Sequence, residues 1–273
     1  MSQSQDLSNI YTHYGDDTNN SIWILHGILG SRQNWGAFAK SLIQKDPTLS
    51  VYTIDLLAHG DNHTAVNQYD IQACVQQLLE LHYTIGGPHS VIGHSFGGKV
   101  ALAYAAESDT LKQVWSLDTS LDAQKQASQN EVLDVIQMCR QVQMPQASRR
   151  SLMTQLQSYG ASLGVAQWMT TNLKRSTEGF VWRFNLNGIE SLIHDYWHVD
   201  AWQILQQLPN HKHAHVLRAE NGLRWSSTAI SQITDLDMLH SNIHAHILPH
   251  AGHWVHIDQP KALLQMIYDQ LSI

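Results

Sequence analysis

The chain has 273 residues and a formal net charge of -7 at pH 7, from 16 Lys and Arg against 23 Asp and Glu. This length allows one large domain, or a core with an inserted subdomain, that buries a substantial apolar interior. The small number of basic residues and the lack of a basic stripe argue against nucleic acid as a partner. Small neutral or amphiphilic molecules are favoured instead.

The first residues, MSQSQDLS, lack the basic start and apolar core of a secretory signal, and no later run is apolar for long enough to span a membrane. Cys74 and Cys139 fall inside helix-like segments, which favours small buried hydrophobes over a disulfide. The sequence therefore predicts a cytoplasmic protein with no membrane span.

Strand-like and helix-like segments alternate from residue 21 onward. Short apolar strands are expected at 22–25, 51–54, 90–92 and 113–117, with helices between them at 35–44, 71–81 and 99–106. Such alternation is typical of parallel strands joined by crossover helices. Because the strands are apolar throughout, both faces of the sheet should be covered. The fold class is α/β, with a mostly parallel central sheet flanked by helices.

The alternation stops after Asp118. Residues 121–197 are rich in Gln, Met and Ser and indicate consecutive helices with no clear strand. They predict a helical cap at 120–197 inserted into a core formed by 1–119 and 198–273. The alternation then resumes with a strand at 214–218, a helix at 226–236, a strand at 244–248 and a final helix at 260–271.

A Gly-x-Ser-x-Gly turn lies between the third strand and its helix, at Gly93-His94-Ser95-Phe96-Gly97. A sharp strand-to-helix turn exposes a serine hydroxyl to a base, and the flanking glycines leave room for it. The motif alone is a weak signal, but the strand before it and the helix after it are the context that it requires. Ser95 is the predicted nucleophile.

The base and the acid follow later strands. His253 lies in a turn after the last strand, where it can reach the serine, and His250 and His256 are weaker rivals. Asp118 and Glu220 each follow a core strand, and either carboxylate would orient the imidazole.

Asp118 is favoured as the acid. Glu220 comes next, and Asp122 and Asp235 are more distant alternatives.

Backbone N–H groups are expected to stabilise the oxyanion that forms during acyl transfer. Ile28, in the loop after the first strand, and Phe96, next to the nucleophile, are the predicted donors. His26 is interpreted as a residue that fixes this loop by hydrogen bonds. Lys99, on the helix after Ser95, is expected to be solvated or to extend its amine to the surface.

The cap should roof the serine and shape an acyl pocket. Its expected lining is apolar, and each side chain is equally compatible with ordinary core packing: Met138, Trp168, Met169, Phe180, Trp197 and Trp254. Alternating histidines at 211–215 and 244–246 lack the spacing and nearby carboxylates of a zinc site, so they are interpreted as solvated strand faces. No metal and no cofactor is predicted.

Several stretches resemble the α/β-hydrolase superfamily, and within it the YbfF-like and ABHD-eleven-like small esterases. They are the loop at 25–35, the turn at 55–61, the elbow at 93–100, the cap segment at 179–186 and the histidine loop at 251–256. The resemblance implies that Asp118 is the acid and that short to medium acyl esters, or acyl thioesters, are hydrolysed. Residues 218–221, Arg-Ala-Glu-Asn, depart from the family's Arg-Gly pattern and keep Glu220 open as a substitute acid.

The predicted function is therefore a carboxylesterase-type serine hydrolase that acts on a small ester or thioester. Two alternatives remain. The same triad supports carbon–carbon bond hydrolysis or cofactor-free perhydrolysis, and the same scaffold supports a ligand receptor without catalysis. A carboxylate nucleophile, as in dehalogenases and epoxide hydrolases, is disfavoured because position 95 is serine.

Overall fold

A seven-stranded sheet forms the centre of the computed structural model, which describes residues 7–123 and 131–271. Its strand order is β1-β3-β2-β4-β5-β8-β9, and only β1 is antiparallel to its neighbour. The strands are β1 (Tyr11–Gly15), β2 (Ser21–Leu25), β3 (Ser50–Ile54), β4 (Ser90–His94), β5 (Gln113–Leu117), β8 (His213–Ala219) and β9 (Ile243–Leu248). The edge strand β1 precedes the first predicted strand and was missed by the sequence pattern.

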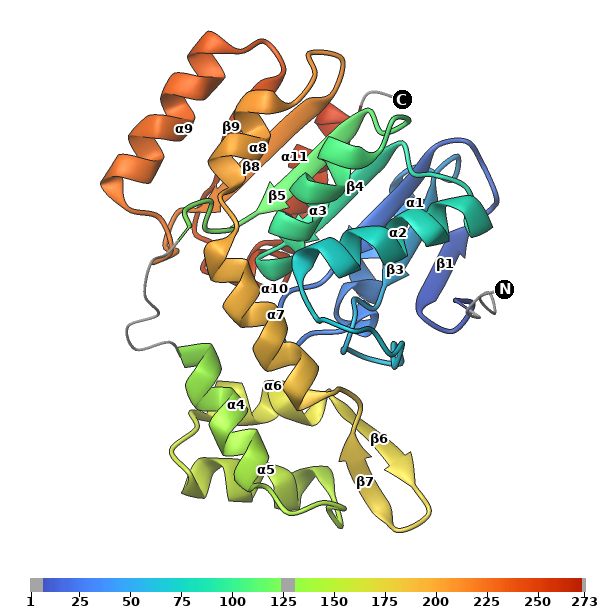
Figure 1. Cartoon of the computed structure of the whole chain (residues 1–273), viewed down its shortest axis with the longest axis vertical. Coiled ribbons are helices and arrows are strands. Elements are labelled where there is room, and N and C mark those ends of the chain that lie inside the picture. The colour runs from blue at the N-terminus through green and yellow to red at the C-terminus, as the bar shows by residue number, and fades with distance from the viewer. Residues whose placement is uncertain (1–6, 124–130, 272–273) are drawn as a thin grey trace.

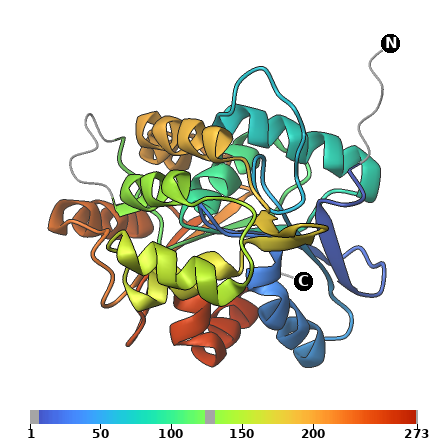
Figure 2. The same cartoon turned by 90° about the horizontal axis from the view of Figure 1, so that it is seen from below.

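Helices cover both faces of this sheet (Figures 1 and 2). One face packs against α1 (Gly36–Lys45) and α11 (Pro260–Gln270). The short helix α10 (Val255–Asp258) packs on the same face. The opposite face packs mainly against α2 (Ile71–Ile85) and α3 (Phe96–Glu107). Two hydrophobic clusters, one on each side of the sheet, account for the uninterrupted apolar character of the central strands.

The segment between β5 and β8 projects from one end of the sheet (Figure 1). Its described elements are α4 (Glu131–Gln141), α5 (Arg149–Ser158), α6 (Leu163–Thr170), β6 (Leu173–Ser176), β7 (Gly179–Trp182), α7 (Leu186–His198) and α8 (Ala201–Gln207). Two other elements lie outside this segment: the 3-10 turn η1 (Arg32–Trp35) follows β2, and α9 (Ser227–Leu239) follows β8. We call residues 131–198 of this segment the cap. The predicted boundaries at 120 and 197 stay a prediction.

The cap contains a β-hairpin that the sequence analysis did not predict. β6 and β7 pair antiparallel, with Leu173 opposite Trp182 and Ser176 opposite Gly179. Gly179 has φ 141°, a conformation that favours glycine, and a Cβ there would lie 2.6 Å from the Gln146 carbonyl oxygen. The expectation of consecutive helices without a strand is therefore wrong, because four-residue strands are too short to show a period of two.

Lys99 is fully buried, so the expectation of a solvated side chain is wrong. Its Nζ donates hydrogen bonds to the carbonyl oxygens of Tyr196 at 2.8 Å, Val199 at 2.7 Å and Asp122 at 3.0 Å. Tyr196 and Val199 lie at the C-terminus of α7, where a cation is favourable. Burial lowers the pKa of Lys99 to about 8. This lysine ties the end of the cap to the core.

The alternating histidines of β8 and β9 are not all exposed to solvent. His215 is buried and stacks on Trp115 with ring centroids 4.3 Å apart. Its Nδ1 lies 3.0 Å from Nε2 of His246 on the neighbouring strand, and burial lowers its pKa to about 2. The interpretation as a solvated face is therefore wrong for His215, because the rings of Trp115 and His246 stack on it and Gln113 Nε2 lies 2.9 Å from its Nε2.

Cys74 and Cys139 are both buried free thiols, as the sequence suggested. No helix in the described part of the chain is long and apolar enough to cross a membrane. A cytoplasmic location stays a prediction.

Candidate active site

Ser95 occupies a strained turn between β4 and α3. Its φ of 53° and ψ of -116° lie outside the regions that L-residues favour. A Cβ at Gly93 would lie 2.1 Å from the Gly97 carbonyl oxygen, and a Cβ at Gly97 would lie 2.5 Å from that of His26. Both flanking positions therefore require glycine, which is the steric reason for the Gly-x-Ser-x-Gly pattern.

Asp118 and His253 meet although 135 residues separate them. Asp118 follows β5 and is fully buried, and its Oδ2 lies 2.7 Å from Nδ1 of His253 in the loop after β9. Its other oxygen accepts the Ala219 N–H at 3.0 Å, so the carboxylate is held in one orientation. Because β4, β5 and β9 run parallel, their carboxyl ends bring Ser95, Asp118 and His253 to one edge of the sheet.

The alternative acids make other contacts. Glu220 is 47% exposed and accepts the His250 N–H at 2.8 Å. Asp122 accepts from Trp202 Nε1 at 2.7 Å, and Asp235 is exposed on α9. Among the residues that the structure describes, Asp118 is the carboxylate that hydrogen-bonds to His253.

The rival histidines also have other environments. The His250 side chain is 84% exposed. His256 is buried and stacks on Trp35 with ring centroids 4.2 Å apart, and burial lowers its pKa to about 4. His94 is a residue whose role the sequence analysis missed, because its Nε2 donates to the His253 carbonyl oxygen at 2.8 Å. His94, the residue directly before Ser95, thus holds the loop that carries His253 by this hydrogen bond.

Burial is the main reason that the pKa of His253 lies below its usual value. The hydrogen bond to Asp118 opposes this shift, whereas the positive charge of Arg224 adds to it. A lowered pKa keeps the imidazole neutral at pH 7, which is the form that can accept a proton.

A cavity of about 210 Å³ lies between the sheet edge and the cap. Ser95 and His253 line it together with Ile28 and Phe96, the predicted oxyanion donors. Within the described residues, Ser95 Oγ makes no hydrogen bond, and the serine–histidine contact stays a prediction. Such contacts are often long without substrate.

The cavity is lined by only some of the side chains predicted for the substrate pocket. Trp168, Trp197 and Trp254 line the cavity, whereas Met138, Met169 and Phe180 are absent from its walls. Met169 is buried in the core cluster, and Met138 and Phe180 pack against that cluster. The lining residues that the sequence analysis missed include Glu131, Val132, Val135, Val165, Ile193, Tyr196 and Arg224.

Two buried histidines fix the loop that carries Ile28. His26 Nε2 accepts the Leu56 N–H at 3.0 Å, and His59 Nε2 accepts the Leu29 N–H at 3.0 Å. Each histidine thus belongs to one loop and binds the other. Burial lowers the pKa of His26 to about 4 and that of His59 to about 3, so both rings are neutral acceptors at Nε2. This geometry agrees with the predicted structural role of His26.

The cap is joined to the same two loops. Asn172, buried directly before β6, donates from Nδ2 to the Leu29 carbonyl oxygen at 2.8 Å. Asn185, directly before α7, donates its backbone N–H to the Ala58 carbonyl oxygen at 2.8 Å. We call these two contacts the cap clasp. Leu29 and Ala58 have φ values of 57° and 65°, so both clasped residues are in the left-handed region.

A family model described as the alpha/beta hydrolase family matches residues 24–266. The chain belongs to the alpha/beta hydrolase family. Its seven-stranded, mostly parallel sheet flanked by helices confirms the predicted fold class.

Relatives of this hydrolase include esterases and a lipase. It is 28% identical to the mouse (Mus musculus) sn-1-specific diacylglycerol lipase ABHD11 over 94% of its own length and 83% of that protein. It is 25% identical to esterase YbfF of Escherichia coli over 96% of both chains. A solved structure titled "Marine microorganism esterase" matches with a TM-score of 0.80 and 26% identity over 96% of this chain and 98% of the other. These similarities and the fold support an enzyme of the carboxylesterase type, as the resemblance implied.

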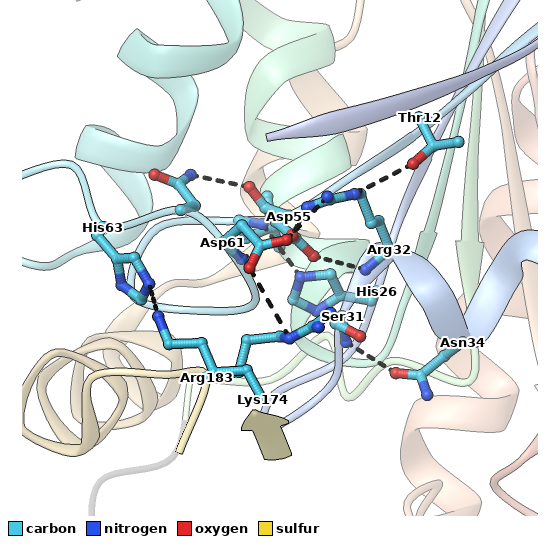
Figure 3. Close-up of polar contacts among 12 residues, drawn as sticks. Thr12, His26, Ser31, Arg32, Asn34, Asp55, Asp61, His63, Lys174 and Arg183 are labelled. Atoms are coloured by element: carbon cyan, nitrogen blue, oxygen red, sulfur yellow. Dashed lines mark hydrogen bonds and ion pairs between the residues drawn. The ribbon is translucent and has the colours of Figure 1, made fainter. Parts of the chain in front are cut away.

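A cluster of ion pairs supports the loop that carries Ile28 (Figure 3). The Arg32 guanidinium pairs with the fully buried Asp55 and, at 2.9 Å, with Asp61. Asp55 also accepts the backbone N–H of Arg32 at 2.7 Å and that of Asp61 at 2.9 Å. From the cap, Arg183 lies 3.8 Å from Asp61, and Lys174 Nζ lies 3.0 Å from His63.

Removal of the Arg32 charge is expected to destabilise the fold strongly. Arg32→Met leaves the carboxylate of Asp55 buried without its cation, which should lower the free energy of unfolding by about 3–5 kcal/mol. Urea unfolding measures this loss. Arg140→Met is the matched control, because it breaks the more exposed pair with Glu190 and should cost less than about 1 kcal/mol. Equal losses in the two variants would contradict the importance of the buried cluster.

Proposed function

We propose that the protein is a serine hydrolase that cleaves carboxylic esters and acyl thioesters of short to medium acyl chains through a Ser95-His253-Asp118 triad. The observation that carries the proposal is the 2.7 Å hydrogen bond between Asp118 and His253 beside a cavity that Ser95 also lines. In the proposed reaction, Ser95 Oγ attacks the acyl carbon while His253 Nε2 takes its proton. Asp118 holds the Nδ1–H tautomer and stabilises the imidazolium.

The oxyanion of the tetrahedral intermediate would accept hydrogen bonds from the backbone N–H groups of Ile28 and Phe96. Phe96 is the first residue of α3, whose first N–H groups have no acceptor within the helix. When the intermediate collapses, His253 returns the proton to the leaving alcohol or thiol. Water then attacks the acyl-enzyme with His253 again as the base, and the carboxylic acid product is released from Ser95.

The cavity supports a small substrate. About 210 Å³ lined largely by Val, Ile and Trp side chains accommodates an acyl chain of limited length. A series of p-nitrophenyl esters from acetate to laurate, with an acyl-CoA series beside it, tests the chain length and the thioester activity. Labelling of Ser95 by a fluorophosphonate tests the nucleophile. A protein that neither reacts with the probe nor hydrolyses any member of either series would contradict the proposal.

Two substitutions of a carboxylate by an amide test which residue is the acid of the triad. Asp118→Asn is expected to lower kcat by about 10⁴-fold, because the amide favours the wrong imidazole tautomer. Glu220→Gln should change kcat by no more than a few-fold, since Glu220 contacts His250 rather than His253. Steady-state kinetics with one p-nitrophenyl ester measures both. A large loss in Glu220→Gln with a small one in Asp118→Asn would assign the role to Glu220 instead.

A further inference from the structure

Arg224 places a positive charge at the wall of the cavity that Ser95 and His253 share. It lies in the loop between β8 and α9, and its Nε is 3.0 Å from Nδ1 of His253. The Nδ1 atom of His253 is also 2.7 Å from Oδ2 of Asp118. One imidazole nitrogen therefore has two neighbours with opposite hydrogen-bonding needs.

The chemistry of these groups leaves the Nε–H of Arg224, whose side chain is exposed, without an acceptor among the residues that the structure describes. Nδ1 has a single site for a proton, and in the tautomer that donates to Asp118 it has no lone pair to offer. The guanidinium has donors only, so its Nε–H then faces another N–H. Arg224 forms no ion pair with a carboxylate of residues 7–123 or 131–271.

The rest of the cavity gives the missing acceptor a position. Most of the wall is apolar, with Trp168, Trp197 and Trp254 around the serine. Glu131 is the charged residue that the cap contributes. A negative group in the cavity is repelled by Glu131 and attracted by Arg224, so it would lie on the core side, next to His253.

We propose that Arg224 binds an anionic oxygen group, a carboxylate or a phosphate, carried by the substrate. This inference rests on the proposed esterase function and names a substrate class for the same cavity. Two guanidinium nitrogens besides Nε allow a bidentate contact with such a group. The bound anion also offsets the Arg224 charge that disfavours the imidazolium, so it should assist proton transfer as well as binding.

A pair of esters of matched length tests the proposal. Mono-p-nitrophenyl adipate carries a terminal carboxylate, and p-nitrophenyl hexanoate is its neutral counterpart. The ratio of their kcat/KM values is expected to favour the adipate by about tenfold or more. Arg224→Gln should bring this ratio to 1 or below, whereas Arg175→Gln, which removes an exposed cation of the hairpin, should leave it unchanged. Because a ratio is measured, a loss of folded protein does not affect it.

A second ester separates the two possible positions of the anion. In 4-(hexanoyloxy)benzoate the carboxylate belongs to the leaving group, and phenyl hexanoate is its neutral counterpart. An Arg224-dependent preference in either pair supports the proposal and assigns the anion to the acyl or to the leaving side. Equal ratios in the wild type and Arg224→Gln for both pairs would overturn it. Failure to hydrolyse the neutral esters and to react with fluorophosphonate would instead refute the proposed function.

Discussion

Ser95→Ala is expected to lower kcat for ester hydrolysis by on the order of 10⁴- to 10⁶-fold and to leave the free energy of unfolding nearly unchanged. The hydroxyl is the proposed nucleophile, and no other group at this turn can form the acyl-enzyme. Alanine keeps the Cβ, so it occupies the same turn at φ 53° with the same strain. Initial rates with a p-nitrophenyl ester measure the effect, and circular dichroism with urea unfolding checks the fold.

Ser116→Ala serves as the control for this substitution. Ser116 lies on β5 next to the elbow helix, is fully buried, and its hydroxyl has no hydrogen-bond partner among the described residues. Its removal should leave kcat within a few-fold of the wild type and leave fluorophosphonate labelling intact. Ordinary turnover in Ser95→Ala, or labelling of that variant at the wild-type rate, would assign the nucleophile to another residue.

The folded protein is expected to lose stability steeply as the pH falls below 6.5. His26, His59, His215 and His256 have pKa values of about 4, 3, 2 and 4 in the folded chain, each because burial disfavours the charged ring. In the unfolded chain a histidine titrates near 6.5, so the unfolded state takes up protons first on acidification. The stability is therefore complete above pH 6.5 and decreases as the pH falls toward 4.

Each of these histidines contributes a slope of about 1.4 kcal/mol per pH unit, and four of them together give roughly 5 kcal/mol per unit between pH 6 and 5. The loss adds up to about 7 kcal/mol between pH 7 and 5, so a stability in the lower half of the 5–15 kcal/mol that is typical of a domain would be lost near pH 5. Urea unfolding at pH 7, 6 and 5.5 measures the slope. His59→Gln should reduce it by about one quarter, whereas His198→Gln, at an exposed site, should not change it. A constant free energy from pH 7 to 5 would contradict this prediction.

The choice of candidate site residues rests on local signals. Ser95 stands out as the candidate nucleophile because glycine at 93 and 97 is required by contacts within 2.5 Å, and such steric requirements are visible in the sequence. Asp118 and His253 follow strands, and parallel strands place their carboxyl ends together. The order of elements therefore indicates which side chains share a site before any distance is known.

The predictions that failed depend on contacts between distant segments. Lys99 lies on a helix that α7 and α8 cover, and nothing near position 99 in the sequence reveals that cover. Met138 and Phe180 are apolar cap residues like Trp168, but the seating of the cap decides which of them reach the cavity. The contact of Arg224 with His253 could not be predicted from the local sequence, because the two residues are 29 positions apart. The change of pattern at 218–221 was the only hint near it.

The cap clasp has a mechanical consequence. Leu29 is held by the core at its N–H, through His59, and by the cap at its carbonyl oxygen, through Asn172. The peptide beside it carries the N–H of Ile28, so a shift of the hairpin by even a fraction of an ångström would tilt that donor. Because Ile28 is a proposed oxyanion donor, we expect a substrate that displaces the cap to be cleaved more slowly than one that leaves the cap in place.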